Sequence, residues 1–265
     1  MFQTLLFTII FLTGLTVGSF LNCVIYRLAN GESFLKGRSF CPHCRQKLSW
    51  IDLIPVLSFL ILKGKCRYCH KKISWQYPLV EITTGFLFVA IYNLQSTIFT
   101  PHFFYLLVTS CFLIIIFVYD LKHCLIPDKV IFPAIGIAFV YRIFEILKTG
   151  LNNNLDFSPL IYALFSAGLA SFFFLLIFLI SNGKWLGFGD VKLVFFLGLI
   201  LSWPNILTGL FFSFLFGALI GTGLIILKKK TLKSEVPFAP FLVAGTLFTF
   251  LWGGNFINWY LKLIL

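Results

Sequence analysis

The chain has 265 residues, of which 59% are hydrophobic and only 11% charged, and its mean hydropathy is +0.97. A soluble domain carries about 25% charged residues, so this composition excludes an ordinary soluble domain and predicts an integral membrane protein. The net charge of +12 does not point to nucleic acid. Basic residues beside membrane helices fix their orientation, and 10 of the 21 Lys and Arg residues fall between Arg27 and Lys72.

The apolar stretches predict an all-α, polytopic membrane protein with about eight transmembrane helices and one small polar insert. No basic segment precedes the first stretch and no small-residue cleavage site follows it, so we expect a membrane helix there and not a signal peptide. The sixth stretch is short, and we expect it to be tilted, half re-entrant, or joined to the seventh by a tight turn. The expected spans are Thr4–Tyr26, Pro78–Thr97, His102–Tyr119, Lys129–Leu147, Pro159–Ser181, Val191–Trp203, Asn205–Leu227 and Phe238–Tyr260.

Alternation of these spans places the basic loops on one side of the membrane: Arg27–Lys72, Lys122, Lys184 and Lys228–Lys233. The positive-inside rule makes that side cytoplasmic, and both termini are then expected outside. Three parts follow from this arrangement. They are a first transmembrane helix (1–27), a cytoplasmic insert (28–77) and a transmembrane core (78–265).

Four cysteines in the insert form two CxxC pairs, Cys41 with Cys44 and Cys66 with Cys69. Two residues between thiolates let both sulfurs of one turn face a single metal ion, and two such turns complete a tetrahedral structural zinc site. A short polar insert has little core of its own, so the metal would supply its folding energy. Disulfides or a redox site are the alternatives, and reduced cytoplasmic thiols argue against disulfides.

The chain holds only nine acidic residues, so each can be weighed. Asp52, in the insert, is expected to be solvated, and Glu145 follows Arg142 by three positions, which predicts a local ion pair. Asp128 follows Pro127 and is expected to cap the next helix. Asp120 has no such structural role, because it ends an apolar helix where the helix dipole disfavours a carboxylate.

Asp190 stands between two long apolar runs, after a turn that contains Gly187 and Gly189. The two glycines allow a sharp turn and close approach of another backbone. Helix capping is the alternative role for Asp190. If Asp120 and Asp190 lie together at one face of the membrane, they form an aspartic-protease dyad that shares one proton and activates a water molecule.

The chain resembles the type IV prepilin leader peptidases along nearly its whole length. The similar segments are GSFLNCVIYRL (Gly18–Leu28), CPHC, CRYCHKKISWQYPLVEITTG (Cys66–Gly85), DLKHCLIPD, GFGDVKL and PFAPFL (Pro237–Leu242). The last motif usually has Gly where this chain has Ala239. That difference should matter little unless the backbone at this position approaches a ligand closely.

The resemblance implies a bacterial inner-membrane enzyme with its active site and zinc insert in the cytoplasm. Such an enzyme cuts the basic leader of type IV prepilins or pseudopilins after Gly, for pilus assembly or type II secretion. It then methylates the new N-terminal residue, usually Phe, with S-adenosylmethionine. By position Asp120 and Asp190 match the catalytic pair and Asp128 a structural acid. Glu81 matches an acid linked to methyl transfer, with an ion pair to a basic loop residue as the alternative.

The implied partners are prepilin or pseudopilin substrates and membrane lipid, with no nucleic acid. Two other functions fit parts of the pattern. One is a different intramembrane aspartic protease of the GxGD type without methyltransferase activity, and the other is a non-enzymatic ion transporter. The four-cysteine insert argues against the first, and acids at one membrane face, not at the midplane, argue against the second.

Overall fold

The computed structural model describes residues 2–33, 37–95, 100–150, 156–228 and 236–264. Within these ranges the chain is helical and forms no strand beyond two isolated β-bridges, which confirms the all-α prediction. The helices are α1 (Phe2–Ala29), α2 (Leu57–Ile61), α3 (Gln76–Gln95), α4 (Pro101–His123), α5 (Asp128–Gly150), α6 (Ser158–Ile180), α7 (Phe188–Leu201), α8 (Asn205–Ile226) and α9 (Ala239–Ile264), with a 3-10 turn, η1 (Ile51–Leu53). They fall into two compact units, Met1–Ile115 and Ile116–Leu265.

Seven of the described helices are long and apolar enough to cross a membrane: α1, α3, α4, α5, α6, α8 and α9. The expected end of the second span, Thr97, lies outside the described residues, as do three of the lysines in Lys228–Lys233. The sixth expected span corresponds to α7. Its 14 residues extend only about 21 Å, whereas the hydrocarbon layer is about 30 Å thick. This helix is therefore too short to cross alone.

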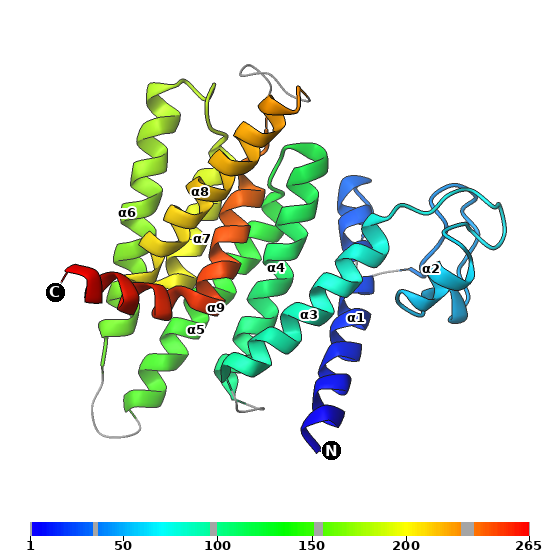
Figure 1. Ribbon diagram of the computed structural model, residues 1–265, viewed down its shortest axis with the longest axis horizontal. Helices are drawn as coiled ribbons and strands as arrows, with labels where there is room; N and C mark the ends of the chain where they lie inside the picture. The colour runs from blue at the N-terminus through cyan, green and yellow to red at the C-terminus, as the bar shows by residue number, and fades with distance from the viewer. Residues whose placement is uncertain (1, 34–36, 96–99, 151–155, 229–235, 265) are drawn as a thin grey trace. The chain divides into compact units, whose positions relative to one another are not determined.

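In the first unit, α1 and α3 cross closely (Figure 1) because both are built from small residues where they meet. A Cβ added to Gly14 would lie 2.6 Å from the Cα of Gly85, and one added to Gly18 would lie 2.7 Å from the Cα of Glu81. Small residues spaced by four allow such backbone approach between membrane helices. The polar insert emerges between these two helices and carries η1 and α2.

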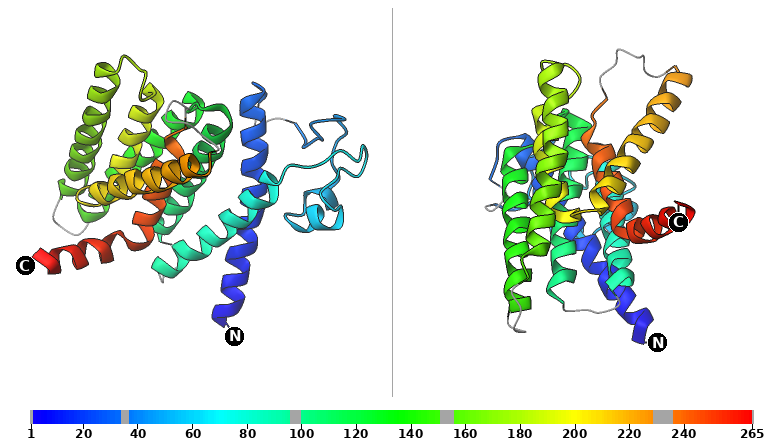
Figure 2. Two further views of the ribbon diagram at one scale, coloured as in Figure 1. Left: turned by 45° about the horizontal axis from the view of Figure 1, so that its top comes forward. Right: turned by 90° about the vertical axis from the view of Figure 1, so that its left-hand side faces the viewer.

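In the second unit, α7 is the buried centre. All residues from Phe196 to Leu201 are buried, together with Val191, Leu193 and Val194. A helix that is apolar on every side is stable only when neighbours cover it completely. Helices α5, α6, α8 and α9 contact it. The C-terminal ends of α6 and α8 and the N-terminal end of α7 lie at the same end of this unit (Figure 1; Figure 2, right).

The tightest contact around α7 is with α6. A Cβ on Gly198 would lie 2.4 Å from the Cα of Ala167 and 2.5 Å from its backbone nitrogen. No side chain larger than hydrogen fits there unless the two helices separate. Gly198 therefore sets the distance between α6 and α7, and with it the position of the first turn of α7.

We expect Gly198→Ala to destabilise the protein by about 1–3 kcal/mol, because overpacking a filled interface forces backbone shifts. Gly168→Ala is the matched control, since a Cβ at Gly168 on α6 would meet nothing within 4 Å. Thermal unfolding in detergent, followed by helical circular dichroism, measures both. Equal melting temperatures for the two variants would contradict this account of the α6–α7 contact.

Candidate active site and cysteine cluster

Asp120 lies in the last turn of α4 and is 5% exposed. Burial and the negative end of the helix dipole both disfavour its charge. The structure supplies a compensation that the sequence did not predict. The backbone N–H of Ala239, the first residue of α9, donates a hydrogen bond to the Asp120 carboxylate. The positive end of one helix thus meets the carboxylate at the negative end of another.

Asp190 lies in the first turn of α7 and is half-buried. The residue at the capping position is Gly187, three positions earlier, so Asp190 is not the N-cap. Its carboxylate instead reaches back to accept a hydrogen bond from the N–H of Gly187, the arrangement of the second half of a capping box. This interaction fixes the direction of the carboxylate relative to the helix axis.

The two aspartate motifs meet in the folded chain. Asp120 is near enough for its charge to act on Asp190. A Cβ on Gly189 would lie 3.2 Å from the Cβ of Ile126, a residue of the first motif. Gly189 therefore leaves room for the first motif. Gly187 does not adopt a left-handed conformation, since its φ is −78°. The two predicted carboxylates are thus brought to one place, with Gly189 at the contact.

Asp128 contributes a second link between the motifs. It lies in the first turn of α5, and its Oδ1 is 2.6 Å from the Nζ of Lys192 on α7. Lys192 also lies over the rings of Phe132 and Phe188. The ion pair joins the N-terminal ends of α5 and α7. Asp128 therefore has a structural role that extends beyond its own helix.

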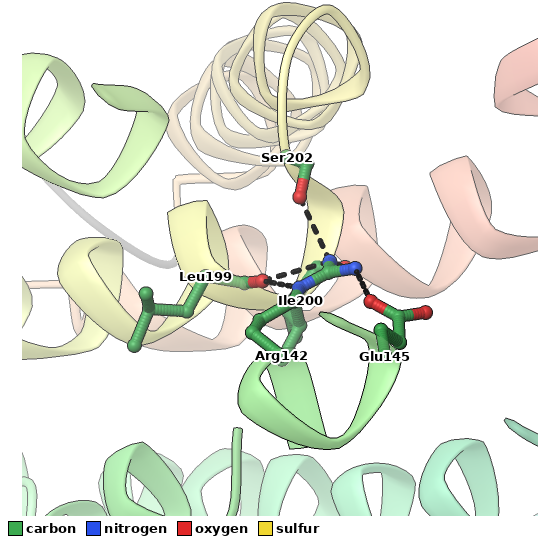
Figure 3. A network of polar contacts seen from close by, with 5 residues as sticks. All are labelled: Arg142, Glu145, Leu199, Ile200 and Ser202. Atoms are coloured by element: carbon green, nitrogen blue, oxygen red, sulfur yellow. Dashed lines mark hydrogen bonds and ion pairs between the residues drawn. The ribbon is translucent and has the colours of Figure 1, made fainter. Parts of the chain in front are cut away.

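Arg142 holds the other end of α7, and its role was not expected from the sequence (Figure 3). Its ion pair with Glu145, at 2.7 Å, was predicted. Its remaining donors bind the Leu199 carbonyl oxygen at 2.9 and 3.0 Å, the Ile200 carbonyl oxygen at 2.9 Å and the Ser202 hydroxyl at 2.8 Å. These carbonyls belong to the last turn of α7, which has no helical partner for them. Arg142 therefore caps α7.

The four cysteines of the insert converge. Their sulfur atoms all lie within 4.8 Å of one another, and the Cys41 and Cys69 sulfurs are 3.9 Å apart. Four sulfurs placed about 2.3 Å from one zinc ion in a tetrahedron are separated by about 3.8 Å. The thiol set therefore fits a zinc ion. His43 and His70, expected as exposed loop residues, are exposed.

Each cysteine pair sits in the same backbone turn, repeated 25 positions later. The N–H of Arg45 binds the Cys41 carbonyl, as the N–H of His70 binds the Cys66 carbonyl, both at 2.9 Å. Arg45 and His70 share a left-handed conformation, with φ of 58° and 57°. Burial raises the pKa of the Cys41 thiol, but N–H groups of Cys44 and His43 that point at the sulfur outweigh burial and lower the pKa to about 7.

Asp52 connects the two turns, and the expectation that it is solvated is wrong. Its side chain is 3% exposed. It accepts hydrogen bonds from the N–H and hydroxyl of Ser49, at 3.1 and 2.8 Å, and lies 2.7 Å from Arg67 and 3.2 Å from the Tyr68 hydroxyl. Arg67 and Tyr68 are the two residues between Cys66 and Cys69. The carboxylate therefore fixes the second turn relative to the segment that follows the first.

Glu81 is buried on α3, at the contact with α1. Its Oε2 accepts a hydrogen bond of 2.8 Å from the backbone N–H of Val56, and the Ser19 hydroxyl also donates to it. Its partners are thus a loop backbone and a hydroxyl, and not the basic loop side chain that was considered. Near it, the Asn22 amide donates to the Tyr77 carbonyl at 3.0 Å. These contacts tie the insert to both helices.

The thiol cluster generates a prediction about metal content. We expect the purified protein to contain about one zinc ion per chain, and Cys66→Ser to lose most of it, because three ligands bind zinc much more weakly than four. Limited proteolysis should then cut residues 37–75 faster. Cys124→Ser is the control, since Cys124 is exposed and outside the cluster. Equal zinc content in the two variants would contradict a zinc site at these cysteines.

Comparison with known proteins agrees with the geometry. The sequence model of the bacterial peptidase A24 N-terminal domain matches residues 12–94, and that of the type IV leader peptidase family matches residues 107–222. No solved structure matches.

Similar proteins include three named prepilin leader peptidase/N-methyltransferase. That of Bacillus subtilis (strain 168) is 32% identical over 97% of this chain and 99% of its own length. That of Aeromonas salmonicida (strain A449) is 31% identical over 98% and 96%, and that of Legionella pneumophila is 30% identical over 97% and 94%. A match of this extent covers both units of the fold and both aspartate motifs, and the chain belongs to the type IV leader peptidase family.

Proposed function

We propose that this membrane protein cleaves the basic leader of type IV prepilins or pseudopilins after Gly, on the cytoplasmic side, and then N-methylates the new N-terminal residue with S-adenosylmethionine. The observation that carries the proposal is the meeting of Asp120 and Asp190 from two separate motifs in one unit. The names and full-length similarity of the relatives support both activities.

In the proposed reaction the two carboxylates share one proton, because two like charges so close together do not both ionise. The ionised carboxylate takes a proton from a water molecule, whose oxygen attacks the carbonyl carbon of the scissile peptide bond. The protonated carboxylate donates its proton to the carbonyl oxygen. When the tetrahedral intermediate collapses, the C–N bond breaks, and a carboxyl group returns a proton to the leaving amine.

The donor arrangement at Asp120 supports this chemistry. Asp120 is held by the N–H of Ala239 at the positive end of α9, and Asp190 by the N–H of Gly187. Each carboxylate thus accepts a hydrogen bond from one backbone N–H, and a carboxylate has further lone pairs with which to bind a shared water molecule. Asp120 is 5% exposed, and surroundings of low dielectric constant strengthen the electrostatic interaction between the pair.

The second activity is proposed for the first unit. S-adenosylmethionine would supply the methyl group, and the amine exposed by cleavage would accept it. Glu81, which accepts hydrogen bonds from the Val56 N–H and the Ser19 hydroxyl at the contact between α1 and α3, is the residue we propose for this step. We further propose that zinc at the four cysteines is structural, and that the chain is organised as a first helix (1–27), an insert (28–77) and a core (78–265).

We place the protein in the bacterial inner membrane, with the insert and Asp120 on the cytoplasmic side. Seven helices long enough to cross a membrane support the multi-pass arrangement. The basic residues support the side. Arg38, Lys63 and Lys72 lie in the insert, and Lys184 lies at the end of the second unit where α6 leads into α7. The positive-inside rule assigns such ends to the cytoplasm.

We expect Asp120→Asn and Asp190→Asn each to lower prepilin cleavage by on the order of 10³-fold or more, because either change removes the shared-proton pair. Asp156→Asn is the control. Asp156 precedes α6 and accepts a hydrogen bond from the Ser158 N–H, and the side-chain oxygen of Asn can accept the same bond.

Mass spectrometry of a co-expressed prepilin reports leader loss and methyl addition separately. Normal processing by both aspartate variants would disprove the proposed active site. If the parent protein cleaves the prepilin but does not methylate it, the proposed peptidase activity stands and the proposed methyltransferase activity is disproved.

The Ala239 contact leads to a second prediction. Ala239→Pro removes the N–H that donates to Asp120, at a first helical position where proline is well tolerated. Loss of a hydrogen bond to a charged group costs about 1.5–3 kcal/mol, so we expect cleavage to fall about tenfold to a hundredfold. Ala239→Gly keeps the donor and should cleave at nearly the parent rate. Equal rates in the two variants would show that the bond to Asp120 does not support catalysis.

A further inference from the structure

The insert carries a set of exposed apolar side chains, which we call the apolar patch. Trp50, Ile61 and Trp75 are 74%, 70% and 69% exposed. The other members are Ile51, Leu53, Leu57 and Leu60, all exposed. Exposed apolar side chains of this size and number are unusual in a segment of 50 residues, and contiguous exposed apolar area marks an interaction surface.

The members of the patch are contiguous. Leu57, Leu60 and Ile61 are spaced as residues i, i+3 and i+4, so they share one face of α2. The opposite face holds Phe59, which is buried and packs against Trp75 with ring centroids 4.9 Å apart and ring planes inclined by 59°. The turn η1, which carries Ile51 and Leu53, lies against α2. Helix α2 and η1 thus expose neighbouring apolar side chains, and Trp75 packs beside α2 through Phe59.

Contacts within the first unit fix the depth of this face. The N–H of Val56, the residue before α2, binds Glu81 at 2.8 Å. Glu81 is the sixth residue of α3, about 7.5 Å along the helix from its first residue, Gln76. Gln76 is itself tied to α1, since its side-chain amide donates to Asn22 at 3.1 Å. Helix α2 therefore begins level with the first turns of a membrane-spanning helix, where the headgroup layer lies.

The charge around the patch is positive. Residues 28–77 hold nine Lys and Arg against two acids, and both acids are already paired, Glu32 with Arg45 and Asp52 with Arg67. Lys47, Lys63 and Lys72 are exposed and lie three residues before Trp50, two after Ile61 and three before Trp75. Apolar and tryptophan side chains beside lysines match the chemistry of an anionic lipid surface.

From this depth and charge we infer that the apolar patch docks on the anionic phospholipid surface of the leaflet that α1 and α3 enter. Leu57, Leu60 and Ile61 insert at the level of the upper acyl chains, Trp50 and Trp75 lie at the headgroup level, and the lysines contact lipid phosphates. The lipid contact then holds the cysteine cluster at the membrane surface. Without it, only the two connections to α1 and α3 would restrain the cluster. This inference does not depend on the proposed enzymatic activity.

Tryptophan fluorescence of the full-length protein in lipid nanodiscs tests the inference. The chain has six tryptophans. Subtracting the emission spectrum of Trp50→Phe from that of the parent protein leaves the emission of Trp50, and the same subtraction with Trp75→Phe leaves that of Trp75. In nanodiscs of phosphatidylglycerol and phosphatidylcholine, we expect both difference spectra to be blue-shifted. Brominated acyl chains should quench them and aqueous iodide should not.

Two further variants separate the apolar and charged contributions. Leu60→Glu with Ile61→Glu should lower the lipid quenching of Trp75 by about twofold or more, because charged side chains at an interface oppose insertion. Lys63→Gln with Lys72→Gln should lower quenching only where phosphatidylglycerol is present. Zinc content serves as the check that each variant keeps the folded insert.

Three outcomes would overturn the inference. Iodide quenching of both tryptophans without lipid quenching would show that the patch faces water. Protection that arises only after a prepilin is added would assign the patch to the substrate. Protection that depends on protein concentration, and is absent in nanodiscs with a single copy, would assign it to a second copy of the chain.

Discussion

In the second unit, the backbone N–H of Ala239 at the start of α9 meets the carboxylate of Asp120 at the end of α4. Asp120 is buried at the negative end of α4, where both desolvation and the helix dipole oppose its charge. The N-terminal end of α9 offers unpaired N–H groups and a partial positive charge at that point. The chain therefore keeps a carboxylate where an isolated helix would reject it, and the start of α9 is fixed by the same contact.

The short helix α7 has carbonyl groups at its C-terminal end that need hydrogen-bond donors. Its 14 residues end about 21 Å from their start, inside the hydrocarbon layer if Asp190 is near the surface. Carbonyl groups at such a helix end must find donors within the protein. Helix α5 begins beside α7 at the Asp128–Lys192 ion pair, and Arg142 lies 14 residues further, at the same depth. Arg142 satisfies the carbonyls, and the two contacts hold α7 at both ends relative to Asp120.

The sequence was informative wherever the signal is local. Long apolar runs defined the helices, the CxxC spacing defined the thiol cluster, and the two aspartate motifs named the residues that the fold brings together. It was uninformative for contacts that use backbone atoms of distant segments. The contacts of Ala239 and Arg142 could not be predicted from the sequence, because every residue has a backbone carbonyl and nearly every residue a backbone N–H. A contact to such a group does not require a particular residue type at that position. The expectation for Asp52 was wrong for a related reason. Besides the nearby Ser49, its partners are Arg67 and Tyr68 of the second cysteine turn, which only the fold brings close.

The same distinction applies to the insert, which is more than a loop that carries four cysteines. Its cysteines can be read from spacing, but its position depends on backbone contacts, chiefly the bond from Val56 to Glu81. A buried carboxylate on a membrane helix that binds the N–H before α2 fixes the depth of everything attached to that turn. The inferred contact of the α2 side chains with lipid follows from this depth, because burial there would remove an exposed apolar surface from water. Glu81 thus has a structural effect on the insert, in addition to the part proposed for it in methyl transfer.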